Sequence, residues 1–243
     1  MRENDYNKTY DDLHVHEDAF RPAQARSVTA ANSFLNKVYG WMFIALALTG
    51  STAWYVAGHP DLVRMASRWM LLFCLLELGL VIGLTAAIRV LPLAAALLGF
   101  FAYSVLNGVT MSLILLVYTS ESVAAAFFAA SLTFGITGLI GWLIKIDLSA
   151  MGRMLLMALI GLIITTVINM FVASSGLHFL ICVAGVLIFA ALTAYDTQKI
   201  KMLAMTLDTR SSAGKLAVLG ALTLYLDFIN LFLYLLQLFG RRR

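Results

Sequence analysis

The sequence predicts an all-α membrane protein: a bundle of seven transmembrane helices with the last helix at its centre. Of its 243 residues, 61% are hydrophobic and only 12% are charged, about half the charged share of an ordinary soluble domain. The mean hydropathy is +0.89, and the apolar residues fall into seven long runs. No soluble core of this size could bury so much apolar surface, so the surrounding medium must be lipid.

The first 37 residues differ from the rest of the chain because they are polar and mixed in charge. The first apolar run starts only near Val38, too far along the chain for a signal peptide. We therefore expect residues 1–37 to form a flexible cytoplasmic tail and residues 38–240 to form one seven-helix transmembrane domain.

Crossing a bilayer takes roughly 20 apolar residues in a helix, and each of the seven runs provides them. The expected spans are residues 38–57, 69–88, 93–117, 123–144, 152–172, 177–200 and 216–239. Glycine and proline occupy several of the short breaks between them, as at Gly58, Pro92 and Gly176. In the fourth run, small residues such as Gly138 and Gly141 predict close helix packing.

The distribution of lysine and arginine favours a cytoplasmic N-terminus. With that orientation, ten basic residues lie on the inner side and five on the outer side. The inner set is Arg21, Arg26, Lys37, Arg89, Lys145, Arg153, Lys199, Lys201, Arg210 and Lys215, and the outer set is Arg64, Arg68, Arg241, Arg242 and Arg243. The terminal arginines disagree with the rule. They would return inside only if the last run were re-entrant, and we expect seven full spans instead.

Three acidic residues fall within the expected spans: Glu77, Asp196 and Asp227. An ionisable side chain at mid-bilayer costs about 2.5–3.5 kcal/mol on insertion scales, whereas each leucine or phenylalanine gains about 0.3–0.6 kcal/mol. Residues this unfavourable indicate a functional site. The alternative is that they are protonated and only hold helices together by hydrogen bonds.

The last run has polar or small residues at helical spacing along one face. They are Gly220, Thr223, Asp227, Asn230, Tyr234 and Gln237. Lipid would not tolerate this face, so we expect the last helix to be central, with its polar face toward the other helices. Glu77, Asn107, Asn230 and Tyr234 are the supporting polar residues expected around the aspartates.

Two carboxyl groups within a few ångströms of each other inside a bundle cannot both ionise cheaply. As a pair, Asp196 and Asp227 would share one proton in acid and become doubly anionic in alkali, when their hard oxygens suit Ca²⁺. Simple antiparallel spans would separate the two residues in height by more than about 10 Å. They meet only if the sixth helix continues past Lys199 or the seventh starts deeper.

Two segments resemble the signature of the Bax-inhibitor family, also called transmembrane Bax inhibitor motif proteins. They are residues 194–200, Ala-Tyr-Asp-Thr-Gln-Lys-Ile, and residues 224–232, Leu-Tyr-Leu-Asp-Phe-Ile-Asn-Leu-Phe. The span count, the chain length and the acid at Glu77 agree with the resemblance, which covers about residues 30 to 240. The lack of long loops resembles a bacterial member, which would lie in the inner membrane.

The resemblance implies a pH-sensitive Ca²⁺ leak, with a di-aspartyl pH sensor and tentative Ca²⁺ site falling on Asp196 and Asp227. It also implies a basic latch late in the second span. Arg89 is the candidate for that latch, although it precedes Leu91-Pro92 rather than heading a basic cluster. We expect no enzymatic activity and no cofactor. The expected partners are the bilayer and Ca²⁺ or protons, and the basic residues beside the spans do not indicate nucleic acid.

Two other functions compete with the leak. An intramembrane aspartyl protease also uses two buried aspartates, and Tyr195-Asp196 fits one half of its motif, but Asp227 lacks the Gly-x-Gly that precedes the second aspartate. The stronger alternative is a non-conducting regulator that binds another membrane protein, such as a protease, through its tail or lipid-facing surface.

Overall fold

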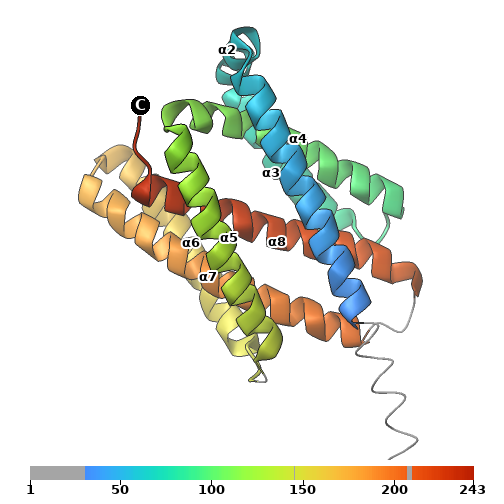
Figure 1. Cartoon of the computed structure of the whole chain (residues 1–243). Helices are drawn as coiled ribbons and strands as arrows, with labels where there is room; N and C mark the ends of the chain where they lie inside the picture. The colour runs from blue at the N-terminus through green and yellow to red at the C-terminus, as the bar shows by residue number, and fades with distance from the viewer. Residues whose placement is uncertain (1–30, 145, 207–209) are drawn as a thin grey trace, which may run out of the picture.

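The computed structural model describes residues 31–144, 146–206 and 210–243. Within these ranges, seven helices are long and apolar enough to cross a membrane. They are an unlabelled first helix Ala31–Ala57, then α3 Met70–Ala87, α4 Leu93–Val117, α5 Ser120–Leu143, α6 Ser149–Val172, α7 Ser175–Thr206 and α8 Arg210–Phe239 (Figure 1). The predicted fold class is confirmed.

The N-terminal boundary and one loop differ from expectation. The first helix already includes residues 31–37, which we had assigned to the tail, and the rest of the predicted tail lies outside the described residues. The break after the first helix contains a short additional helix, α2, Pro60–Arg68. Proline at its first position and Asp61 in its first turn favour a helix start, and an Arg64–Asp61 ion pair braces its exposed side.

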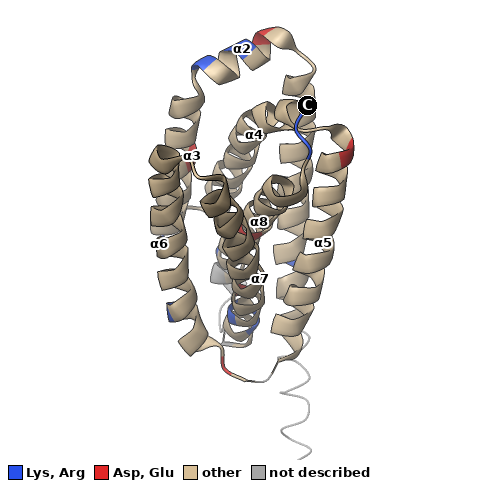
Figure 2. Ribbon diagram, turned by 90° about the vertical axis from the view of Figure 1, so that its left-hand side faces the viewer, with Lys and Arg blue, Asp and Glu red and all other residues tan. Residues whose placement is uncertain are grey.

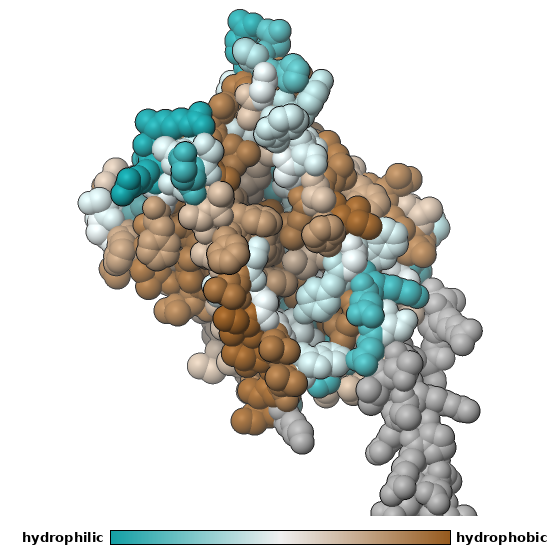
Figure 3. Space-filling view, viewed as in Figure 1, coloured by the Kyte–Doolittle hydropathy of each residue, from teal (hydrophilic) through white to brown (hydrophobic). Residues whose placement is uncertain are grey.

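The last helix lies at the centre of the bundle, as predicted. In the most apolar part of each helix, the share that is buried is 67% for α8, 44% for α4 and 6% for α3. It packs against α7, α5 and α4, and α7 in turn packs against α5 and α6. Charged residues gather mainly at the two ends of the bundle (Figure 2), and a broad apolar surface lies between them (Figure 3). This arrangement fits a bundle whose sides face lipid.

The polar stripe of α8 is only partly enclosed, which corrects the prediction that the whole stripe faces the other helices. Gly220 and Asp227 are buried, but Gln237 is exposed, and Thr223, Asn230 and Tyr234 are half-buried. The most deeply buried positions of α8 are mainly apolar, among them Leu224, Leu231 and Leu236. The bundle surrounds α8 on several sides, so apolar side chains fill the tightest contacts. Thr223 and Asn230 instead donate hydrogen bonds to carbonyls of their own helix.

The close approach of α5 to α7 depends on one glycine. A Cβ atom at Gly141 would overlap the backbone carbonyl of Ala194, so only glycine fits where the two helices touch. The packing role predicted for the fourth span is therefore seen directly at Gly141, whose contact residue Ala194 lies two residues before Asp196 on α7.

Candidate functional site

The register between α7 and α8 brings the two aspartates together. Ile200 packs against Gly220, and farther along the same helix pair Gly185 packs against the ring of Tyr234. Asp196 and Asp227 lie between these two contacts. α7 continues to Thr206 and α8 begins at Arg210, so both helices are six residues longer at this end than the expected spans. The condition under which the aspartates could meet is therefore fulfilled.

The two carboxyl groups form a buried pair. Asp196 is 8% exposed and Asp227 is 5% exposed, and the two carboxyl groups are close enough to interact. Ionised carboxylates only accept hydrogen bonds, so the two groups can bond to each other only through a shared proton. Oδ2 of Asp227 is fully buried, and no N–H or O–H donor among the described residues reaches it. A buried oxygen without a donor is costly, and such groups are rare in folded proteins.

The surroundings of the pair are aromatic on one side and polar on another. The ring of Phe228, the residue after Asp227, meets the rings of Phe127 and Phe134 of α5 edge-on at 5.5 and 5.6 Å. On α7, the ammonium of Lys199 interacts electrostatically with Asp196 and lies 5.8 Å from the centre of the Tyr195 ring. Lys199 follows Asp196 by three residues, about one helical turn, so its positive charge favours the ionised form of Asp196.

Tyr39 connects the first helix to the same part of α7. Its hydroxyl lies 3.4 Å from Oγ1 of Thr197, the residue after Asp196. A Cβ at Gly138 of α5 would lie 3.4 Å from the Tyr39 hydroxyl, so the three helices converge here. Tyr39 is a neighbour that sequence reasoning missed, because a tyrosine in an apolar helix gives no signal of its own.

Gln198 is a second missed residue, and it fastens the connection between α5 and α6 to α7. Its Oε1 accepts a hydrogen bond from the backbone N–H of Leu148 at 2.9 Å, and its Nε2 donates to the carbonyl of Ile146 at 2.8 Å. The side chain is nearly buried. The only available signal was its place in the segment 194–200, two residues after Asp196.

A separate polar chain lies on the other side of α8. Glu77 of α3 accepts hydrogen bonds from Thr110 Oγ1 at 2.8 Å and from Asn107 Nδ2 at 3.5 Å. The hydroxyl of Tyr225 donates to Asn107 Oδ1 at 3.1 Å and lies 2.7 Å from Thr49 Oγ1 of the first helix. We call these five residues the Tyr225 chain. Glu77 and Asn107 were predicted as supporting residues; Thr49 and Tyr225 were not.

The remaining predicted residues make other contacts. Asn230 donates to the carbonyl of Leu226, and Tyr234 stacks on Phe189 with ring centres 5.8 Å apart. Arg89 is exposed at the end of α3, where its carbonyl accepts a hydrogen bond from Lys215. Among the described residues, its side chain makes no contact with either aspartate.

The acid pair offers few ligands for a metal ion. Across the described ranges, no group of three or more His, Cys, Asp or Glu side chains is close enough to hold a metal ion. Ca²⁺ takes six to eight oxygen ligands, and the pair supplies carboxylate oxygens from only two residues. Water or backbone carbonyls would have to complete the shell of any Ca²⁺ ion at this position.

Comparison with known proteins supplies relatives over nearly the whole chain. Residues 31–243 match the family model described as "Inhibitor of apoptosis-promoting Bax1". The chain is 43% identical over 216 residues to "Inner membrane protein YbhL" of Escherichia coli strain K12, which covers 87% of this chain and 92% of the relative. It is 39% identical to an uncharacterized protein of Deinococcus radiodurans, over 90% of this chain and 95% of that protein. The match includes every described helix.

Proposed function

This chain belongs to the Bax inhibitor family, and on that premise we propose that it is a pH-sensitive leak for cations such as Ca²⁺, gated by Asp196 and Asp227. It is a multi-pass protein of the bacterial inner membrane. We propose that its N-terminus and the connection between α7 and α8 face the cytoplasm, because the inner loops would then hold most of the basic residues.

The observation that supports the gate is the buried carboxyl pair with one oxygen left without a partner. A purely structural hydrogen bond between helices would satisfy its polar atoms, as the Tyr225 chain does. In the acid pair, by contrast, no N–H or O–H donor from the described part of the chain reaches Oδ2 of Asp227. This arrangement leaves a position where a proton or a cation would be stabilised on arrival.

Protonation would hold the gate closed. With one shared proton, the carboxyl groups hydrogen-bond to each other and keep α7 against α8. Without that proton, two anions at about 4 Å repel by several kcal/mol at an effective dielectric constant near 20. A change of this size shifts a closed-to-open equilibrium by a few orders of magnitude. The positive charge of Lys199 would offset part of this repulsion at Asp196. The hydroxyl of Tyr39 is uncharged and would not.

Flux through the purified chain tests the proposal. The full-length protein is reconstituted alone into liposomes that contain a Ca²⁺ indicator, and the external pH is stepped from acid to alkaline. We expect Ca²⁺ entry to increase as pH rises. Asp227→Asn and Asp196→Asn imitate the protonated acid without ionising, so each variant should flatten this pH profile. Glu77→Gln makes the same chemical change in the Tyr225 chain and should keep the wild-type profile.

A pH-independent flux, or no flux at any pH, would remove the gated leak. If there is no flux at any pH, the chain is better described as a non-conducting regulator that binds another membrane protein. Deleting residues 1–30 separates the two functions further, because a leak should keep its flux without the tail, whereas a regulator that binds through the tail should lose its activity.

A further inference from the structure

The C-terminal arginines, which disagree with the positive-inside count, are held in a fixed position. Beyond α8 the chain pairs with the connection between α4 and α5 through an antiparallel bridge between Arg242 and Tyr118. The backbone N–H of Arg243 donates to the carbonyl of Val117 at 2.9 Å, and the N–H of Arg241 donates to Ser122 Oγ at 2.9 Å. The arginines thus lie at the α2 end of the bundle (Figure 1).

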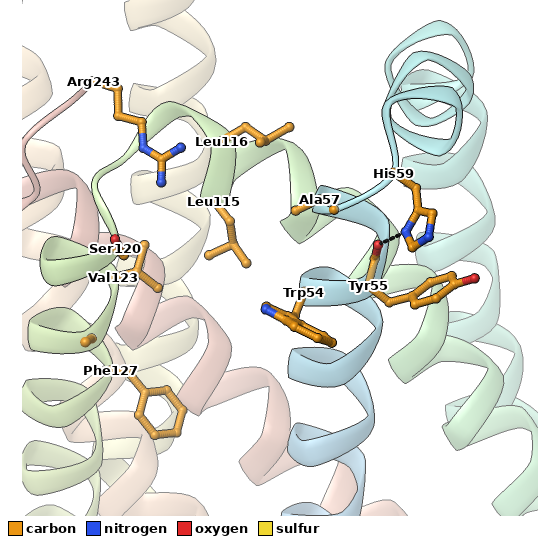
Figure 4. Close-up of a pocket in the computed structure, with 12 residues that line it drawn as sticks. Trp54, Tyr55, Ala57, His59, Leu115, Leu116, Ser120, Val123, Phe127 and Arg243 are labelled. Atoms are coloured by element: carbon orange, nitrogen blue, oxygen red, sulfur yellow. Dashed lines mark hydrogen bonds between the residues drawn. The ribbon is translucent and has the colours of Figure 1, made fainter.

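Arg243 overhangs a pocket of about 670 Å³ at this end. The pocket lies between the end of the first helix, the end of α4 and the start of α5 (Figure 4). Trp54, Tyr55, Leu115, Val123 and Phe127 provide its apolar and aromatic lining. His59 and the guanidinium of Arg243 stand at its rim (Figure 4). None of the lining residues is acidic.

We propose that this pocket binds an anionic phospholipid, with the phosphate on Arg243 and an acyl chain along α5. The lining extends down α5 from Ser120 to Phe127, which is about 10 Å at 1.5 Å per residue. A bare phosphate would fill only the rim of so large a pocket. Trp54 and Tyr55 are the residue types that lie at the level of lipid headgroups. The positive charge at the rim suits the lipid phosphate, and the apolar lining below it suits the acyl chain.

The neighbouring groove provides an internal comparison. On the other side of the start of α5, Arg241 borders a pocket of about 600 Å³ lined by Ala125, Ala129 and Phe239. Glu121 also lines that pocket, and its carboxylate opposes an anion there. Arg241 and Arg243 therefore differ in the charge that surrounds them, although they lie two residues apart. This inference does not depend on the proposed leak.

Quenching of tryptophan fluorescence by brominated lipids measures the preference of the pocket for phosphatidylglycerol over phosphatidylcholine. Trp41, Trp69 and Trp142 are replaced by phenylalanine so that Trp54, inside the pocket, is the only reporter. The full chain is reconstituted in bilayers of phosphatidylcholine that contain increasing brominated phosphatidylglycerol, and then in the reverse mixture. We expect phosphatidylglycerol to be preferred by on the order of tenfold, the value of one charge-assisted contact.

The arginine variants decide the assignment. Arg243→Gln should reduce the preference to near parity, while Arg243→Lys and Arg241→Gln should keep most of it. The backbone bonds of Arg243 do not use its side chain, and a thermal unfolding curve for each variant checks that the fold is kept. Three results would overturn the proposal: no preference in the parent protein, an unchanged preference in Arg243→Gln, or equal losses in Arg241→Gln and Arg243→Gln. Loss of the preference on adding glycerol phosphate alone would also overturn it, since the ligand would then be a soluble phosphate.

Discussion

Tyr225 and Asp227 lie two residues apart on α8, and their polar groups have opposite surroundings. The Tyr225 hydroxyl is completely buried, donates to Asn107 and is within 2.7 Å of Thr49. Asp227 is almost as deeply buried, but it meets another acid and leaves Oδ2 without a partner. On one face of α8 the buried hydroxyl has hydrogen-bond partners. On the other face one buried carboxyl oxygen has no donor among the described residues.

This difference separates a structural network from a site that can respond. A satisfied hydrogen bond contributes about 0.5–1.5 kcal/mol to stability, and a donor or acceptor left alone in the interior costs about 1–3 kcal/mol. The Tyr225 chain joins three spans, the first helix, α4 and α8, and reaches α3 through Glu77, so it stabilises one arrangement. In the proposed gate, the acid pair would carry an unfavourable free energy that a proton or a cation could relieve. The following changes test whether the two faces differ in this way.

The largest effect is expected where α7 is pressed against α5 beside the acid pair. Gly141→Ala places a methyl group in the backbone carbonyl of Ala194, and the helices must separate. We expect a loss of about 3 kcal/mol or more in the free energy of unfolding, at the top of the usual range for overpacking. Gly135→Ala on the same helix is the control, because no atom lies within 4 Å of the added methyl. Equal thermal midpoints for the two variants would contradict the close contact.

Removing the hub of the satisfied face should have the next largest effect. Tyr225→Phe keeps the ring but leaves Thr49 and Asn107 without their buried partner, so we expect a loss of about 1–3 kcal/mol. Denaturant unfolding in detergent measures it. Tyr103→Phe is the matched variant: its ring packs edge-on against Tyr225 at 5.7 Å, but its hydroxyl is not in the Tyr225 chain. An equal loss of stability in Tyr103→Phe would show that the hydrogen bonds of the Tyr225 chain are not the cause.

The unsatisfied face should respond with the opposite sign. Asp227→Asn removes a carboxylate that has no donor on Oδ2, so the variant should keep its stability at pH 6 and gain on the order of 1 kcal/mol at pH 9. Glu77→Gln should instead lose a few tenths to about 1 kcal/mol at either pH, because both Glu77 oxygens accept hydrogen bonds. Unfolding curves at the two pH values measure this, and matching losses in both variants would erase the distinction.

An acid outside the membrane-spanning helices should give the smallest effect, a loss of stability that disappears in acid. The hydroxyl and the backbone N–H of Ser149 donate to Asp147 and hold its pKa below the usual value. A lowered pKa stabilises the fold above the unfolded pKa, and this stabilisation is lost as pH falls through the folded value. Asp147→Ala should therefore slightly lower the thermal midpoint at neutral pH and leave it unchanged in strong acid. A deficit that persisted in acid would mean that the carboxylate is not the cause.

Much of the fold could be predicted because lipid imposes a simple rule on the sequence. Each span from 69–88 onward overlaps its helix, since about 20 apolar residues must be helical to cross a bilayer. The helix Pro60–Arg68 was missed because it is short and half polar. The first helix includes residues 31–37, which the sequence assigned to the tail, because Asn32, Asn36 and Lys37 interrupt the apolar pattern there.

The site was harder to predict because it depends on contacts between distant residues. The cost of burying an acid identified Asp196 and Asp227, but their contact needed the extra turns of α7 and α8 around residue 206. Tyr225 lies two residues before the predicted Asp227 and was still missed, because a tyrosine is common in membrane helices and its partner Thr49 is 176 residues away. The stripe pattern gave the correct central helix but not which of its faces is most deeply enclosed.

The position of Tyr225 relative to Asp227 has a mechanical consequence for α8. Two residues along a helix correspond to about 200° around its axis, so Tyr225 and Asp227 project from nearly opposite sides of α8. Any turn that separates the two acids also swings the Tyr225 hydroxyl away from Thr49 and Asn107, at about 1 kcal/mol for each bond that is stretched. The hydrogen bonds of the Tyr225 hydroxyl therefore oppose a rotation of α8 that would separate the two acids. In the proposed gate, the pH at which the acids separate would therefore also depend on Tyr225, which exchanges no proton with them.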